Sequence, residues 1–158
     1  MLNVTLRSVG GILSGILLTM ALVMPAMAGD PQKMINAGQD GVAIKGYDTV
    51  AYFTENRSMP GTPEFTYTWQ DVDWYFANSK HRNLFAANPE RYAPQFGGFC
   101  ANGMSKGKVV VADPEAWTIV DEKLYIKFSE VARDKWRQDK ARKIEKANEV
   151  WADLQNPG

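Results

Sequence analysis

Aromatic and polar residues alternate along the segment EFTYTWQDVDWYFA, residues 64–77. An aromatic residue stands at every second position as far as Trp69, the stretch from Asp71 to Asp73 breaks the pattern, and aromatic residues resume at Trp74. A period of two is typical of a β-strand, and an acidic break between two such runs is typical of a turn. The segment therefore predicts a β-hairpin, so the fold must contain antiparallel strands.

The aromatic side chains of this hairpin allow two interpretations, which concern Tyr67, Trp69, Trp74 and Tyr75. They could line a ligand cleft, or they could be the cross-strand pairs that stabilise the two strands. Cross-strand packing is the more common role of such residues and is the interpretation that we favour.

The rest of the chain predicts both strands and helices. A strand or strand-turn unit is expected at 42–53. Further strands are expected at 108–111, 116–121 and 123–128, the last two joined by a turn at Asp121-Glu122. A short helix is expected to begin near Asn78 or Ser79, a helical turn to run from Pro89 to Tyr92, and an amphipathic helix to run from about Glu130 to Leu154. The predicted fold class is α+β: a small antiparallel sheet with short inserted helices and a long C-terminal amphipathic helix.

The N-terminal residues resemble a targeting signal. The apolar run from Gly10 to Met24 is shorter than the roughly 20 residues that span a bilayer, and small residues follow at Ala26 and Ala28. We expect residues 1–28 to be a signal peptide cleaved after Ala28, which places the mature protein in the periplasm. Residues 29–41 are expected to be a flexible leader, and residues 42–158 a single domain.

Charge limits the class of partner. The sequence has 18 basic and 18 acidic residues, and Arg7 is the only charged residue before the expected cleavage site. A nearly neutral mature chain gives no reason to expect a nucleic-acid partner, and cleavage would leave no membrane segment. The C-terminal helix carries basic residues, but interspersed acidic residues indicate a solvated face rather than a lipid-binding one.

Three quoted stretches identify a resemblance to a known family: GYDTVAYF, WYFANSKHRNLFAANPERYAPQFGGFCANG and DPEAWTIVDEKLYIKFS. In this order they resemble the exported YHS-domain proteins, and the similarity runs from about Ala43 to Trp151. It includes the pattern Trp136, Ile144, Ala147 and Trp151 in the C-terminal helix.

The resemblance implies metal handling, because the better known YHS modules are similar to appendages of proteins that handle copper and other heavy metals. Those modules carry Phe-Cys-x-x-x-Cys after the hairpin. Here Ala77 follows Phe76 in place of the first cysteine, and His81 stands at the second cysteine position. The resemblance therefore transfers only one possible ligand position, His81.

The only cysteine, Cys100, lies four residues before Met104. A thiolate and a thioether are soft donors that suit Cu(I), and on one helical turn they would share a face. His81 is the only histidine and could complete a three-coordinate site. The leading hypothesis is a periplasmic carrier or buffer of a soft metal ion, with copper as the expected ion, Cys100 as the principal ligand and His81 and Met104 as secondary ligands.

Three alternatives stay open. If Cys100 is buried and inert, the protein would be a metal-free module that binds another periplasmic protein or a small ligand. A reactive thiol would indicate a redox protein. A Cys100–His81 pair could act in catalysis with Asp48 orienting the ring, but no signature of a cysteine enzyme surrounds these residues, and Asp48 is also a typical turn residue. The sequence thus favours a binding protein over an enzyme.

Overall fold

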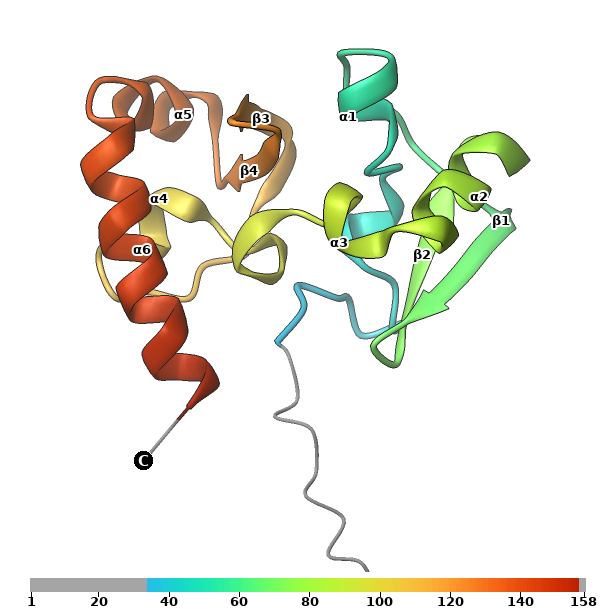
Figure 1. The fold of residues 1–158 in the computed structure, drawn as a ribbon, viewed down its shortest axis with the longest axis horizontal. Helices are drawn as coiled ribbons and strands as arrows, with labels where there is room; N and C mark the ends of the chain where they lie inside the picture. Colours follow the sequence, from blue (N-terminus) through green and yellow to red (C-terminus); the bar gives the residue numbers. More distant parts are fainter. Residues whose placement is uncertain (1–33, 157–158) are drawn as a thin grey trace, which may run out of the picture.

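The structure, a computed structural model, describes residues 34–156 and has an α+β fold. Two short hairpins form two separate antiparallel sheets, one of β1 and β2 and the other of β3 and β4. Figure 1 shows each hairpin with its own helices, and the segment that contains α3 lies between the two groups. We call residues 42–92 the first half of the fold and residues 95–156 the second half.

The first half contains the β-hairpin that the alternating aromatic residues predict. Strands β1 (Thr62–Trp69) and β2 (Val72–Phe76) pair in antiparallel register, with Tyr67 opposite Trp74. The turn lies at Gln70 and Asp71 rather than at Asp71–Asp73, and both turn residues have positive φ. Positive φ at two central residues is the signature of a type I′ turn, which matches the twist of the strands.

Two asparagine caps explain the helices that follow. Helix α2 (Ser79–Ala87) begins where the Asn78 side chain accepts the backbone N–H of His81, and α3 (Pro89–Tyr92) begins where Asn88 accepts that of Arg91. Each cap satisfies one of the backbone donors that a helix start leaves unpaired. Both helices are confirmed as the sequence predicts them.

The second half contains a hairpin and the remaining helical segments. Its elements are η2 (Gln95–Gly98), α4 (Ala101–Met104), β3 (Asp113–Val120), β4 (Lys123–Lys127), α5 (Glu130–Arg137) and α6 (Lys140–Gln155). The predicted turn at Asp121-Glu122 is confirmed, again with positive φ at both residues.

The C-terminal helix is two helices rather than one. Asp139 lies between α5 and α6 with φ −147° and ψ 49°, outside the helical region. Trp136, near the end of α5, is fully buried against Tyr125 of β4, and Figure 1 shows α6 continuing in a different direction. The break therefore lets one amphipathic pattern cover two different surfaces, which helical periodicity alone does not reveal.

The predicted strand unit at 42–53 is wrong for most of its length. The segment forms a 3₁₀ turn, η1 (Ile44–Gly46), and a single helical turn, α1 (Ala51–Thr54). The cause is Asp48, whose Oδ1 accepts the N–H groups of Val50 and Ala51 at 2.9 and 3.2 Å and so begins the helical turn. A local side-chain bond of this kind overrides the β propensity of valine and aromatic residues.

The strand predicted at 108–111 is also absent. The carbonyl of Val110 accepts the N–H of Cys100, but the segment joins no sheet. Val109 and Val111 on either side are exposed and Val110 is partly buried, so the run of three valines is a connection outside any sheet with one partly buried side chain.

The N-terminal segment is ordered where the structure describes it. Asn36 donates its backbone N–H to Gly97 O at 2.8 Å and its side-chain amide to Gly98 O at 3.1 Å. Ala37 pairs with Ala43. Residues 36 and 37 therefore contact both halves. The expected signal peptide and residues 29–33 of the expected leader lie outside the described residues.

One large cluster of buried side chains crosses the two halves. It includes Phe85 of α2 together with Leu124 and Ile126 of β4, so the halves share a core. A second cluster, around Trp136, lies wholly in the second half. Among the residues described, none of the helices has the length and apolar character needed to cross a membrane.

Candidate functional site

Cys100 lies fully buried at the start of α4. Its Sγ accepts the backbone N–H of Gly103 at 3.3 Å, and its own N–H donates to Val110 O at 2.8 Å. The thiol thus acts as the cap of a helical turn. With no exposed surface, the sulfur has no direct access to a ligand from solvent.

Met104 is also fully buried, but in a different environment. It belongs to the second cluster, with Phe96, Tyr125 and Trp136, whereas Cys100 belongs to the cluster that crosses the halves. The four-residue spacing places the two residues on one helical turn, where Met104 N–H donates to Cys100 O at 2.9 Å. Their side chains nevertheless belong to separate packing environments, because Cys100 precedes the turn as its cap.

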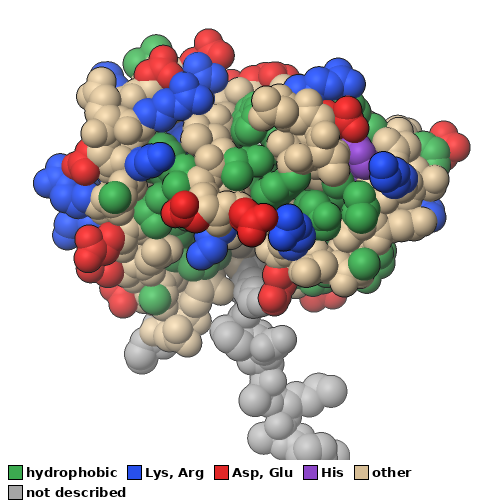
Figure 2. Space-filling view, turned by 45° about the horizontal axis from the view of Figure 1, so that its top comes forward, with side chains coloured by type: hydrophobic (Ala, Val, Ile, Leu, Met, Phe, Trp, Pro, Cys, Tyr) green, Lys and Arg blue, Asp and Glu red, His purple; other side chains and the backbone are tan. Residues whose placement is uncertain are grey.

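His81 lies on α2 in the first half, where both ring nitrogens have partners. Nδ1 lies 2.6 Å from Asp48 Oδ2, and Nε2 lies 3.2 Å from Thr54 Oγ1 and 3.7 Å from Glu55 Oε1. The side chain is 3% exposed, and only a small part of it is visible at the surface in Figure 2. His81 therefore joins α2 to the segment around α1.

Asp48 is the centre of this arrangement: it contacts the His81 ring and also acts as a turn residue, which confirms the turn interpretation. Its Oδ1 accepts the N–H groups of Val50 and Ala51, and its Oδ2 accepts that of Ala77 at 2.9 Å together with the contact to His81. The carboxylate is completely buried. A buried carboxylate is stable only when its oxygens are hydrogen-bonded, and here four partners fulfil that condition.

The three residues predicted to hold copper do not form a common site in this structure. Cys100 and Met104 are sealed in separate clusters, and His81 is bonded to Asp48 and Thr54. Within residues 34–156 no group of three or more His, Cys, Asp or Glu side chains could hold a metal ion. Copper binding stays a prediction, and it would require these side chains to leave their present partners.

Lys127 is a buried charge that sequence reasoning did not identify. Its Nζ donates to Tyr125 O at 3.0 Å and lies 4.2 Å from the centroid of the Trp136 ring. Burial lowers the pKa of its ammonium to about 7; the nearby positive charge of Arg137 adds to the shift, and Cys100 opposes it. Because alternating strand residues usually place a lysine on the solvent face, the pattern of β4 gave no signal of this burial.

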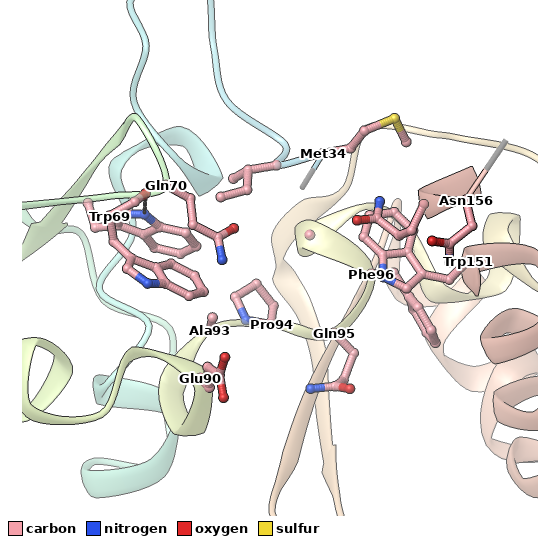
Figure 3. Close-up of a pocket in the computed structure, with 14 residues that line it drawn as sticks. Met34, Trp69, Gln70, Glu90, Ala93, Pro94, Gln95, Phe96, Trp151 and Asn156 are labelled. Carbon is pink, nitrogen blue, oxygen red and sulfur yellow. Dashed lines mark hydrogen bonds between the residues drawn. The ribbon is translucent and has the colours of Figure 1, made fainter. Parts of the chain in front are cut away.

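An open cleft of about 430 Å³ lies between the two halves. Figure 3 shows its walls: Trp69 and Gln70 of the first hairpin on one side, Phe96 and Trp151 on the other, and Ala93 and Pro94 between them. The full lining is Met34, Ile35, Trp69, Gln70, Trp74, Glu90, Ala93, Pro94, Gln95, Phe96, Gly97, Trp151, Gln155 and Asn156.

Each wall of the cleft has a pair of aromatic rings. On the first wall the Trp69 and Trp74 ring centroids are 5.7 Å apart with the planes tilted by 56°. On the second wall Phe96 and Trp151 make an edge contact at 6.2 Å. Trp74 is also fixed by donating Nε1–H to Trp69 O at 3.2 Å. The rings are therefore held in place by contacts within the chain.

Gly97 explains how the N-terminal segment reaches the cleft. Its φ is +59°, and a Cβ at this position would collide with the backbone carbonyl of Met34. Only glycine allows this close approach of two backbones. The segment at Met34 and Ile35 thus completes one edge of the cleft.

Sequence reasoning found part of this cleft. Trp69 and Trp74 were considered as possible ligand contacts, although cross-strand packing was favoured. In the structure both residues line the cleft, and their rings also pack against each other. Phe96, Trp151 and the carboxamides were missed. Their one common signal is glutamine or asparagine close to an aromatic residue, which is too frequent in sequences to be diagnostic.

Comparison of the chain with protein-family models, with curated proteins and with solved structures gives no match in any of the three. The resemblance to the exported YHS-domain proteins therefore stays a prediction.

Proposed function

We propose that this protein is an exported binding module that holds a small organic ligand in the cleft between its two halves. The observation that carries the proposal is the convergence of two pre-positioned aromatic pairs on one open cavity. Small-molecule sites are typically concave, largely formed in advance, and lined by aromatic groups with a few polar ones. A volume of about 430 Å³ is within the usual range for such sites.

The exposure of the rings supports a role beyond packing. Trp74 is buried, but Trp69 and Trp151 are only partly buried although they lie on opposite walls. A ligand that covered about 100 Å² of apolar surface here would gain about 2.5 kcal/mol from burial alone. Phe96, like Trp74, is buried, so the exposed parts of Trp69 and Trp151, one on each wall, offer the binding energy that the folded chain itself does not use.

The state of the thiol supports the same proposal. Cys100 is enclosed and acts as a helix cap, as expected for the metal-free module with an inert thiol. Thiol catalysis would need Cys100 next to His81, yet His81 is bonded to Asp48 and Thr54 instead. Binding is therefore the function that the described residues favour.

A neutral fluorescent probe, N-phenyl-1-naphthylamine, tests the proposal. We expect its emission to rise and saturate with the mature protein, and Trp69→Ala and Trp151→Ala each to weaken binding at least fivefold. Trp117→Ala is the matched control, because Trp117 is also a partly exposed tryptophan but lies outside the cleft. Absence of saturable binding, or weakening only in the Trp117 variant, would refute the proposal.

The predicted copper function has its own test. A Cu(I) titration of the mature protein against a competing chelator would give about one bound equivalent, lost in Cys100→Ala, if the sequence-based hypothesis holds. If the protein retains no copper but the fluorescent probe binds in the cleft, the copper hypothesis is wrong and the binding module remains the function.

A further inference from the structure

We propose that a pocket between β3 and α5 binds a phosphate monoester, with the phosphate on Arg133 and Arg137 and the organic part against Trp117. The pocket has a volume of about 390 Å³. Its described lining consists of Asn56, Trp117, Thr118, Ile119, Arg133 and Arg137, and it shares none of these residues with the described lining of the cleft. The site is therefore additional to the one proposed above and does not depend on it.

The two arginines lie on one face of α5, because they are four residues apart in the same helix. Helix α5 packs against β3, and both arginine side chains line the pocket that the two elements form. A guanidinium group has five N–H donors in one plane and binds phosphate oxygens in pairs. Two such groups one helical turn apart can therefore hold one phosphate from two directions.

Acidic side chains contact the two arginines but do not saturate them. Arg133 donates to Glu130 and Asp134, each at 3.3 Å, whereas Arg137 lies 3.7 Å from Asp134, beyond hydrogen-bond distance. Both acidic residues are exposed, and ion pairs in contact with water are weak. A phosphate dianion that accepts from both guanidinium groups at once makes stronger, charge-assisted bonds and can replace these contacts.

The rest of the lining suits an organic group attached to the phosphate. Trp117 is partly exposed, and its ring packs against that of Tyr52, with the two centroids 5.1 Å apart. Tyr52 is itself fixed, because its hydroxyl donates to Pro114 O at 2.9 Å. The indole offers apolar area to the organic group, and Asn56 adds a carboxamide that can donate to a phosphate oxygen. A pocket of this volume fits a small molecule rather than a single ion.

A pair of guanidinium groups favours phosphate over carboxylate. A carboxylate has two oxygens in one plane, which a single guanidinium satisfies with a bidentate contact. A phosphate monoester has three terminal oxygens and carries nearly two negative charges at neutral pH. Arg133 and Arg137 together match both the charge and the number of acceptors. The ligand class that this pocket selects is therefore a phosphate monoester.

Isothermal titration of the mature protein with phenyl phosphate tests the proposal, at low ionic strength because salt weakens contacts between exposed charges. We expect a Kd below about 1 mM, with inorganic phosphate binding about fivefold more weakly because it lacks the ring that covers Trp117. Arg133→Gln and Arg137→Gln should each weaken the binding of phenyl phosphate about tenfold. Trp117→Ala should remove the advantage of phenyl phosphate over inorganic phosphate.

Arg142→Gln is the matched control and should leave binding unchanged. Arg142 is also paired with an aspartate, Asp139, but it lies on α6 and outside the pocket lining. An equal loss in this variant would show that general charge, not the pocket, attracts the probe, and would overturn the proposal. Thermal melting of each variant confirms that it is folded, so that a loss of affinity is not a loss of structure.

The remaining outcomes are equally decisive. Absence of saturable binding, or binding that is unchanged in both Arg133→Gln and Arg137→Gln, would refute the site. Phthalate, an aromatic dicarboxylate, should bind more weakly than phenyl phosphate, and tighter binding of phthalate would overturn the phosphate assignment. Binding of N-phenyl-1-naphthylamine should be the same in both arginine variants as in the wild type. Failure of this pocket is therefore distinguishable from failure of the cleft.

Discussion

The buried carboxylate of Asp48 gives the sharpest test of how this fold is held together. Its two oxygens accept the N–H groups of Val50, Ala51 and Ala77 and contact Nδ1 of His81. Replacing Asp48 with alanine would leave three backbone donors without an acceptor. Each such donor costs about 1–3 kcal/mol when buried, and entry of water offsets part of the sum. We expect the free energy of unfolding to fall by about 4 kcal/mol.

Asp48→Asn is expected to have a smaller effect. The amide oxygen can still accept from Val50 and Ala51, and His81 can change its tautomer so that Nδ1 accepts from the new amide. Only the N–H of Ala77 then faces a donor, so the cost is about 1–3 kcal/mol. Urea unfolding followed by circular dichroism measures both variants, and a domain of this size loses about 4 °C in melting temperature per kcal/mol.

Asp153→Ala is the matched control, because this aspartate is exposed on α6. It should change the free energy of unfolding by less than about 0.5 kcal/mol. The reasoning would be refuted if Asp48→Ala cost less than about 1 kcal/mol, or if the alanine and asparagine variants were equally destabilised. Either result would mean that the four contacts of Asp48 are not what orders α1 against α2.

Three further predictions concern other parts of the chain. Gly97→Ala should destabilise the protein by several kcal/mol more than Gly107→Ala in urea unfolding, because both glycines have positive φ but only Gly97 lies against the Met34 carbonyl; equal effects would contradict the close approach. The Cys100 thiol, fully buried, should react with a thiol reagent only after denaturation; rapid labelling of native protein would show that it is accessible. The pKa of Lys127 is lowered from 10.5 to about 7, so between these values the unfolded chain binds more protons than the folded one. Stability measured from pH 7 to 9 should therefore rise in the wild type relative to Lys127→Met, and parallel curves for the two proteins would refute the shift.

The parts of the fold that the sequence predicted are those that depend on neighbouring residues. The β1–β2 hairpin follows from the alternation around Trp69, and the starts of α2 and α3 follow from Asn78 and Asn88, which cap helices within three residues. In each case the structural cause lies in the same short segment as the pattern. Such elements need no knowledge of the rest of the chain.

The parts that the sequence did not predict depend on distant contacts. The segment at 42–53 forms η1 and α1, and Asp48 there also accepts from Ala77 and contacts His81. The burial of Lys127 depends on Trp136, nine residues later and on another element. The cleft is assembled from the N-terminal segment, the first hairpin, η2 and the end of α6, so no single stretch of sequence contains its signal.

The position of the cleft between the halves has a practical consequence. Any compound that contacts both Trp69 and Trp151 would connect segments more than eighty residues apart in the chain, and it would do so only in the native state. Such a compound raises the melting temperature in proportion to the logarithm of its concentration over Kd. Collections of metabolites can therefore be ranked by a simple heating experiment, without a labelled ligand, and the same measurement on Trp151→Ala would separate genuine occupants from general stabilisers.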